Sequence, residues 1–223
     1  MADTLLTDSE CEALRQRALS QPLVTHIYTA DPSAHVFDGR IYIYPSHDIE
    51  AGVAFNDNGD HFAMQDYHVL SLDHPQAQAV DHGVALHIDD VPWAERQMWA
   101  PDAACKDGRY YFYFPAKNAA GRFQIGVATS DSPTGPFKPQ PAPIQGSYSI
   151  DPAVFADDDG SFYLYFGGIW GGQLQQYRNN QYSAQYAEPD ASKPALGPKV
   201  ARLRDDMLEF AEAPREIIIL DEH

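Results

Sequence analysis

Three stretches of the chain share one pattern of apolar and polar positions, and this pattern predicts most of the strands. In each stretch an aspartate precedes a short apolar run, an Asp-Gly pair follows, and large aromatic residues come next. The copies span residues 31–44, 102–113 and 151–165. An Asp-Gly pair between two β-prone runs is a strong hairpin signal, because the turn needs positive φ angles that glycine adopts without steric cost. Each copy is therefore predicted to form two antiparallel strands.

The spacing of the copies indicates how the hairpins are arranged. A lone hairpin is marginally stable in water and must pack on neighbours. The leading aspartates, Asp31, Asp102 and Asp151, are 71 and 49 residues apart. Repeats of about 40–50 residues that are built of strands are typical of propeller blades, and uneven spacing fits blades with unequal insertions. Because the innermost strand of each blade lines a central channel, we expect the three aspartates to converge at one mouth of it.

The rest of the pattern predicts one all-β unit. Residues 3–20 are expected to form a helix with a Thr7/Glu10 capping box, ended by Pro22. Further strands are expected at 23–28, 67–72, 85–88, 123–129, 173–177 and 217–220, and a short helix at 202–210. We therefore divide the chain into an N-terminal helical extension, residues 1–21, and a β-propeller domain, residues 22–223.

Charge and composition exclude several classes of partner. The chain of 223 residues has 15 basic and 32 acidic residues, which gives a net charge of −17. Nucleic acids and anionic membranes bind Lys- and Arg-rich surfaces, so neither is an expected partner. Two cysteines do not make a disulfide framework. The sequence has no signal-peptide pattern and no apolar run of membrane-spanning length, so we expect a cytoplasmic protein.

The nine histidines predict no metal centre. They are scattered without the compact spacing that a zinc site needs. The acidic run at residues 157–159 falls at a hairpin tip and is interpreted as a solvated turn. We therefore assign no metal ligands. The sequence also leaves the oligomeric state open.

The aspartate motifs resemble those of a known family. Ala30-Asp31-Pro32-Ser33, Trp99-Ala100-Pro101-Asp102 and Ser149-Ile150-Asp151-Pro152, in this order and each followed by a hairpin, are similar to family 43 of the glycoside hydrolases. The resemblance covers residues 22–220. It implies a five-bladed β-propeller that hydrolyses xylan or arabinan with inversion at the anomeric carbon, as a β-xylosidase or an α-L-arabinofuranosidase. The implied partner is a xylo- or arabino-oligosaccharide.

The resemblance also implies residue roles. Asp31 matches the family's general base, and Asp151 matches the aspartate that tunes the pKa of the general acid. Asp102 receives no catalytic role and is interpreted as a turn former that bonds its own backbone. Trp99 and Trp170 are candidate sugar-stacking walls, with packing between blades as the alternative for each. Some family members hold a calcium ion in the channel, but no calcium ligands can be assigned here and no cofactor is expected.

The chain departs from the family at the general acid, which is a glutamate in a later blade. The nearest match is Glu212-Ala213-Pro214, and no Asp-Gly aromatic hairpin follows it. We therefore expect the acid beyond His223, in a C-terminally truncated, incomplete propeller of three blades plus part of a fourth. Such a chain is expected to be inactive by itself. The alternative functions are a non-catalytic carbohydrate-binding propeller and an endo-arabinanase.

Overall fold

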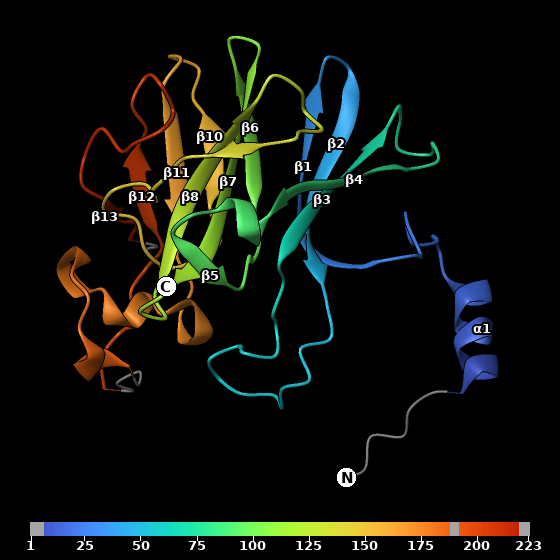
Figure 1. Cartoon of the computed structure of the whole chain (residues 1–223), viewed down its shortest axis with the longest axis horizontal. Helices are drawn as coiled ribbons and strands as arrows, with labels where there is room; N and C mark the ends of the chain where they lie inside the picture. Colours follow the sequence, from blue (N-terminus) through green and yellow to red (C-terminus); the bar gives the residue numbers. More distant parts are fainter. Residues whose placement is uncertain (1–6, 188–191, 219–223) are drawn as a thin grey trace, which may run out of the picture.

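The computed structural model of the protein describes residues 7–187 and 192–218. Its strands form antiparallel sheets that stand beside one another (Figure 1). The first sheet is a meander in the order β1-β2-β3-β4. Its strands are β1 (Tyr28–Phe37), β2 (Arg40–Asp48), β3 (Asp66–Leu72) and β4 (Val80–His87).

Two further sheets follow in chain order. The second contains β5 (Ala94–Arg96), β6 (Asp102–Lys106), β7 (Arg109–Asn118), β8 (Phe123–Ser130) and β9 (Lys138–Pro139). The third contains β10 (Ala153–Ala156), β11 (Phe162–Phe166), β12 (Lys199–Arg202) and β13 (Arg215–Glu216). Every strand of the described residues belongs to one of these sheets. The protein is thus an incomplete propeller with three blades in this part of the chain, which we number 1 to 3.

The hairpins predicted from the Asp-Gly pairs are confirmed. Asp38 and Gly39 have φ angles of 50° and 78° between β1 and β2, and Asp107 and Gly108 have 52° and 75° between β6 and β7. Positive φ at both central residues is the type I′ geometry, whose twist matches that of paired strands. The third turn is longer and places Gly160 at a φ of 84°.

The core consists of two layers, one on each side of blade 2. Alternate residues of β7 face different blades, as the two-residue period of a strand requires. Phe112 and Phe114 pack into the layer shared with blade 1, whereas Tyr111 and Tyr113 pack into the layer shared with blade 3. The run of aromatic residues in β7 is therefore explained by burial on both faces.

Asp102 links the innermost strands of the three blades. Strand β6 lies next to both β1 and β10. The buried Asp102 carboxylate accepts a hydrogen bond from His35 Nε2 on β1 at 2.6 Å and another from the Val154 backbone N–H on β10 at 2.6 Å. The interpretation of Asp102 as a turn former bonding its own backbone is therefore wrong, because both of its partners lie on neighbouring blades.

The N-terminal helix α1 spans Asp8–Arg17 and stands apart from the sheets (Figure 1). The predicted capping box is present: the Thr7 hydroxyl accepts the Glu10 backbone N–H, and the Glu10 carboxylate accepts the Thr7 backbone N–H. None of the residues of α1 is buried. Residues 3–6 of the predicted helix lie outside the described residues. No helix in the described part of the chain combines the length and apolar character needed to cross a membrane.

Two sequence predictions near the C-terminus are wrong, and a third differs from the structure in its described residues. Residues 202–210 were expected to be helical, but they continue β12 into a loop closed by a Leu203–Phe210 bridge. The expected strand at 173–177 lies among the 3₁₀ turns η2 (Trp170–Gly172), η3 (Leu174–Gln176), η4 (Arg178–Asn180) and η5 (Ala184–Tyr186). The expected strand at 217–220 is replaced by β13, which ends at Glu216, and residues 219–220 lie outside the described residues. Left-handed residues such as Gln173 and Met207 divert the backbone in these segments.

Candidate active site

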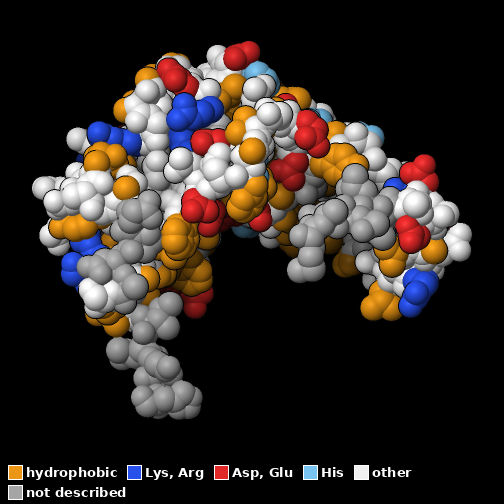
Figure 2. Space-filling view, turned by 90° about the horizontal axis from the view of Figure 1, so that it is seen from below, with side chains coloured by type: hydrophobic (Ala, Val, Ile, Leu, Met, Phe, Trp, Pro, Cys, Tyr) orange, Lys and Arg blue, Asp and Glu red, His pale blue; other side chains and the backbone are white. Residues whose placement is uncertain are grey.

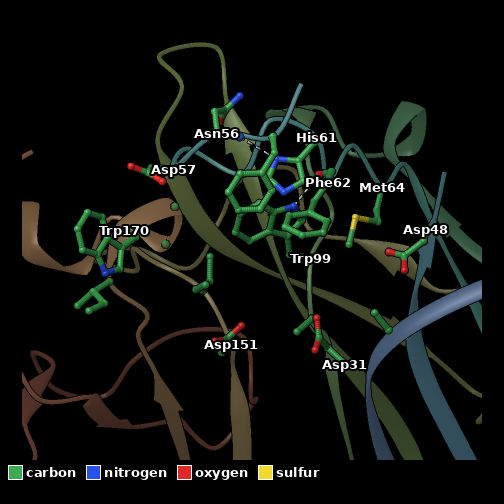
Figure 3. Close-up of a pocket in the computed structure, with 18 residues that line it drawn as sticks. Asp31, Asp48, Asn56, Asp57, His61, Phe62, Met64, Trp99, Asp151 and Trp170 are labelled. Carbon is green, nitrogen blue, oxygen red and sulfur yellow. Dashed lines mark hydrogen bonds between the residues drawn. The ribbon is translucent and has the colours of Figure 1, made fainter. Parts of the chain in front are cut away.

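A cavity of about 510 Å³ lies at the end of the sheets that carries the loops around residues 49–65 and 167–172. Figure 2 views the chain from this end and shows it arched around a hollow. Figure 3 shows the side chains of the cavity. Its lining combines acidic and aromatic residues: Asp31, Asp48, Phe55, Asp57, His61, Phe62, Trp99, Asp151 and Trp170.

A β-bulge positions Asp31. Ala30 pairs with Ser46 and Ser33 pairs with Tyr44, so Asp31 and Pro32 together oppose one residue of β2. Bulges re-aim side chains and are frequent next to active sites. Asp31 also has a φ of 46°, a left-handed conformation that is rare before proline. The local strain turns its carboxylate into the cavity (Figure 3).

A network of backbone and hydroxyl groups positions Asp151. Asp151 precedes β10 and has a φ of 56°. Two residues earlier, the fully buried Ser149 hydroxyl donates to the Gly172 carbonyl at 2.7 Å and accepts from the Gly168 N–H at 3.0 Å. These bonds attach the segment before Asp151 to the loop that carries Trp170. The Asp151 carboxylate lies in the same cavity as that of Asp31 (Figure 3).

The acidic side chains of the cavity influence one another. Poor solvation in the hollow, and then the negative charge of Asp31, raise the pKa of Asp151 to about 6. Asp151 nevertheless stays partly exposed to solvent. The same two causes raise the pKa of Asp48, with desolvation as the larger one. The cavity therefore favours a protonated carboxyl group near Asp31.

Asp48 is a cavity residue that the sequence analysis missed. It ends β2, and the register places it opposite Tyr28 at the start of β1. It follows no proline and heads no hairpin, so the aspartate motif does not mark it. Only the cross-strand pairing of β1 with β2 could have placed it near Asp31.

Trp99 forms one wall of the cavity and is held from several sides. Its indole N–H donates to the Phe62 carbonyl at 2.8 Å, and its ring meets that of Phe62 edge-on at 6.1 Å. Lys117 lies 5.9 Å from the ring centroid and donates to the Asn58 carbonyl. The ring is half-buried and lines the same cavity as Asp31.

Trp170 and His61 complete the rim of the cavity. Trp170 is 50% exposed, on the side of Asp151 (Figure 3). His61 accepts the Asn56 backbone N–H at Nδ1, at 3.3 Å. This assigns its proton to Nε2, for which the described residues offer no partner. His61 was not predicted as a site residue, since only the folded loop turns it toward Trp99.

Glu212 lies outside this cavity. It lines a separate surface hollow with Asn180, Arg204 and Glu209, and its carboxylate accepts the Arg202 backbone N–H at 3.2 Å. It is therefore not placed to share a substrate with Asp31 and Asp151. No glutamate in residues 7–187 and 192–218 lines the cavity.

The described residues do not assign a calcium ion. Among them, one group of three His, Cys, Asp or Glu ligands has its ligand atoms within 4.8 Å of one another, and it contains His47, Asp66 and His68. Two of these ligands are imidazoles, whereas calcium takes six to eight oxygen ligands.

Comparison with known proteins decides the family. Residues 20–216 match the profile of glycosyl hydrolases family 43. This chain belongs to that family. The match contains all three aspartate motifs, and it confirms the resemblance seen in the sequence.

Several named proteins are similar to the chain over most of its length. The chain is 62% identical to a xylosidase/arabinosidase of Humicola insolens over 89% of its own length, and 58% identical to one of Bacteroides ovatus over 90%. It is also similar to the crystal structure of a family 43 enzyme of Xanthomonas citri complexed with xylose, with 61% identity, a TM-score of 0.88 and 98% of this chain covered. The chain spans 63%, 62% and 63% of these three proteins.

A further structural relative was crystallised in a calcium-free form. It is a β-xylosidase/α-arabinofuranosidase from a compost microbial metagenome, in complex with xylotriose in a calcium-free form. Its identity to this chain is 64% and its TM-score 0.82, over 88% of this chain and 61% of that one.

Proposed function

We propose that the chain carries the general base and the pKa-tuning aspartate of an inverting glycosidase that cleaves xylose- or arabinose-containing glycans. The observation that carries the proposal is the convergence of Asp31 and Asp151 in one cavity with aromatic walls. The relatives with xylosidase and arabinosidase activity support the choice of sugar.

Asp31 is the proposed base. Inversion requires a carboxylate that takes a proton from water while this water attacks the anomeric carbon. A protonated carboxyl group on the other face of the sugar donates its proton to the leaving oxygen, about 6.5–9.5 Å from the base, so that the water fits between them. In this proposal the attacking water lies in the cavity, beside the Asp31 carboxylate that lines it.

Asp151 is the proposed tuning residue. A negative charge close to the general acid favours the protonated form of that acid. Because no described glutamate lines the cavity, the acid comes in this proposal from a residue outside residues 7–187 and 192–218. Near neutral pH Asp151 is mostly ionised, since its pKa of about 6 lies below 7.

The aromatic residues are the proposed sugar contacts. Pyranose and furanose rings present C–H faces that pack on aromatic rings, and Trp99 and Trp170 offer such rings on two sides of the cavity (Figure 3). Xylotriose and xylose are bound in structures of relatives. A xylo-oligosaccharide is therefore the first ligand to test.

A second candidate function is carbohydrate binding without catalysis by the chain as given. The absence of a described glutamate from the cavity favours it. Isothermal titration of the 223-residue chain with xylotriose, beside hydrolysis of an aryl β-xyloside and an aryl α-arabinofuranoside, separates the two functions. Binding without turnover supports the second candidate, whereas robust turnover by a monomer would place the acid within these residues. Endo-arabinanase activity and a cytoplasmic location stay predictions, which digestion of linear arabinan and cell fractionation would test.

Asp31→Asn tests the base in a version of the protein extended to the length of its relatives. Loss of general-base catalysis should lower kcat about 10²–10⁴-fold, with little effect on substrate binding, because the proton moves only in the transition state. Asp158→Asn, at the exposed tip of the β10–β11 hairpin, is the matched control and should leave kcat unchanged. A loss below tenfold for Asp31→Asn would reject the assignment.

A further inference from the structure

A second cluster of ionisable side chains lies on blade 1, away from the cavity lining. His47 on β2 donates its Nδ1–H to Oδ1 of Asp66 on β3, at 2.7 Å. Nε2 of His68, two residues along β3, lies 3.9 Å from the same oxygen. The three ligand atoms are within 4.8 Å of one another, and the side chains are between 13% and 19% exposed.

The strand geometry explains why these residues meet. Ser46 pairs with Tyr67 across β2 and β3, which sets His47 beside Asp66. Tyr67 and Val69 face the core layer shared with blade 2. Because side chains alternate along a strand, Asp66 and His68 point to the opposite face of the sheet. The two-residue period thus gathers three ligands on one face.

His68 is oriented by a second carboxylate. Its Nδ1 lies 2.9 Å from Asp81 Oδ1 on β4, and Asp81 is itself held by the Gly83 N–H at 2.8 Å and by His26 Nε2 at 2.7 Å. A hydrogen bond from Nδ1–H to a carboxylate leaves the lone pair of a neutral imidazole on Nε2. That lone pair faces the Asp66 carboxylate. Metal-binding histidines typically show this arrangement, in which a carboxylate holds the ring nitrogen that does not bind the ion.

We propose that His47, Asp66 and His68 form a binding site for a divalent first-row transition metal ion such as zinc, with Asp81 as the positioning residue for His68. Two imidazoles and one carboxylate are a donor set that zinc accepts, and the negative net charge of the chain attracts cations. Calcium is disfavoured because it takes oxygen ligands.

Binding an ion requires the three donor atoms, which lie within 4.8 Å of one another, to adjust their separations. Zinc bonds of about 2.0–2.1 Å in tetrahedral geometry place neighbouring donors about 3.3 Å apart. The pair at 2.7 Å must therefore separate slightly and the pair at 3.9 Å must close slightly. On binding, the ion displaces the proton shared by His47 and Asp66, and this proton leaves to solvent. A water molecule would take the fourth position.

The ion would join neighbouring strands of blade 1. His47 precedes Asp48, which lines the cavity, so the site also anchors the end of β2. The inference does not depend on the proposed glycosidase function. The sequence spacing could not reveal it, because residues 47, 66 and 68 meet only through the pairing of β2 with β3.

The test is zinc binding by the 223-residue chain, purified with a tag that lacks histidine and stripped with a chelator. Equilibrium dialysis against zinc chloride, followed by metal analysis, measures the bound zinc even if the chain self-associates. We expect one zinc ion per chain with micromolar or tighter affinity, and no competition from calcium. Cobalt(II) in the same site should show visible absorption bands typical of mixed nitrogen and oxygen ligands.

Variants decide whether the bound zinc occupies this site. Asp66→Asn, which keeps the shape of the side chain, and His47→Ala should each weaken zinc binding at least tenfold. Asp81→Asn, which leaves the three ligands in place, should weaken it about 10–100-fold. His74→Ala, on an exposed loop, is the control and should change nothing. Circular dichroism checks that each variant folds. If a ligand variant does not fold, zinc binding by Asp81→Asn is the measurement that tests the site. No zinc binding, or binding that none of the three variants weakens, would overturn the proposal.

Discussion

At the scale of single residues, Asp31 and Asp151 share an unusual backbone. Both adopt left-handed conformations before a proline, and both face the same cavity. Such strained positions persist only where the surrounding structure holds them, and they concentrate at functional sites. Their difference lies in their surroundings, because the raised pKa of Asp151 is due to desolvation and to the charge of Asp31.

This raised pKa predicts a pH-dependent stability. The folded chain holds a proton on Asp151 up to about pH 6, whereas the unfolded chain loses it near 3.8. The folded state therefore binds more protons in this window, and the free energy of unfolding contributed by Asp151 falls as the pH rises from about 4 to about 6. Asp151→Asn removes the unfavourable charge, so it should raise the Tm relative to the native chain at pH 7.5.

The comparison at two pH values makes this prediction specific. At pH 4 the native carboxyl is protonated, so the difference in Tm between Asp151→Asn and the native chain should shrink. Asp158→Asn, at an exposed hairpin tip, should show no such dependence on pH. Equal effects of Asp151→Asn on Tm at pH 4 and pH 7.5 would contradict the assignment of the raised pKa to Asp151.

Among the structural elements, the loop that follows β2 packs closely against Trp99. The loop is tied down by Gln97 Nε2, which donates to the Gly59 carbonyl at 2.7 Å. Gly59 has a φ of 68°, and a Cβ there would come within 2.4 Å of the Trp99 ring. The position of this cavity wall therefore depends on a glycine in the loop opposite it.

Gly59→Ala should displace the Trp99 ring and weaken xylotriose binding. Gly52→Ala is the matched control, because Gly52 has a φ of 65° in the same loop but no atom within 4 Å of the added Cβ. Both variants carry the left-handed strain of about 1–2 kcal/mol. Only Gly59→Ala also introduces a steric clash, and such overpacking destabilises the folded chain by about 1–3 kcal/mol more. Thermal unfolding, tryptophan fluorescence and xylotriose titration measure the difference, and equal effects of the two variants would contradict the clash.

At the scale of the whole molecule, blades 1 and 3 each have one face without a neighbouring blade in the described structure. In blade 3, Val154 and Leu164 pack toward blade 2, whereas Phe155 and Tyr165 on the alternate positions are exposed. In blade 1, Val36 is 67% exposed. The apolar side chains of these strands are therefore buried on one face only, whereas those of β7 in blade 2 are buried on both faces.

These faces predict self-association of the 223-residue chain. Contiguous apolar surface favours association, and the net charge of −17 opposes it. We expect light scattering to give a mass above that of the 24.8 kDa monomer, rising with protein concentration. Val36→Lys combined with Phe155→Lys should shift the distribution toward monomer. A monodisperse monomer of the unmodified chain would refute the prediction.

Local patterns along the chain were enough to predict the hairpins, the family and two of the cavity carboxylates. These follow from local rules: Asp-Gly pairs need positive φ angles, aromatic alternation suits a pleated strand, and the aspartates precede prolines at fixed points of a repeat. The N-terminal capping box is equally local, because Thr7 and Glu10 are three residues apart.

The contacts between residues far apart in the sequence could be seen only in the folded chain. Asp48 and His61 join the cavity, and Asp102 bonds to two neighbouring blades, through strand pairing and loop folding that no local pattern encodes. The segment at 173–177 forms 3₁₀ turns instead of the expected strand. His47, Asp66 and His68 form a cluster for the same reason: strand register converts separations of many residues into contacts, whereas a sequence pattern reports only neighbours along the chain.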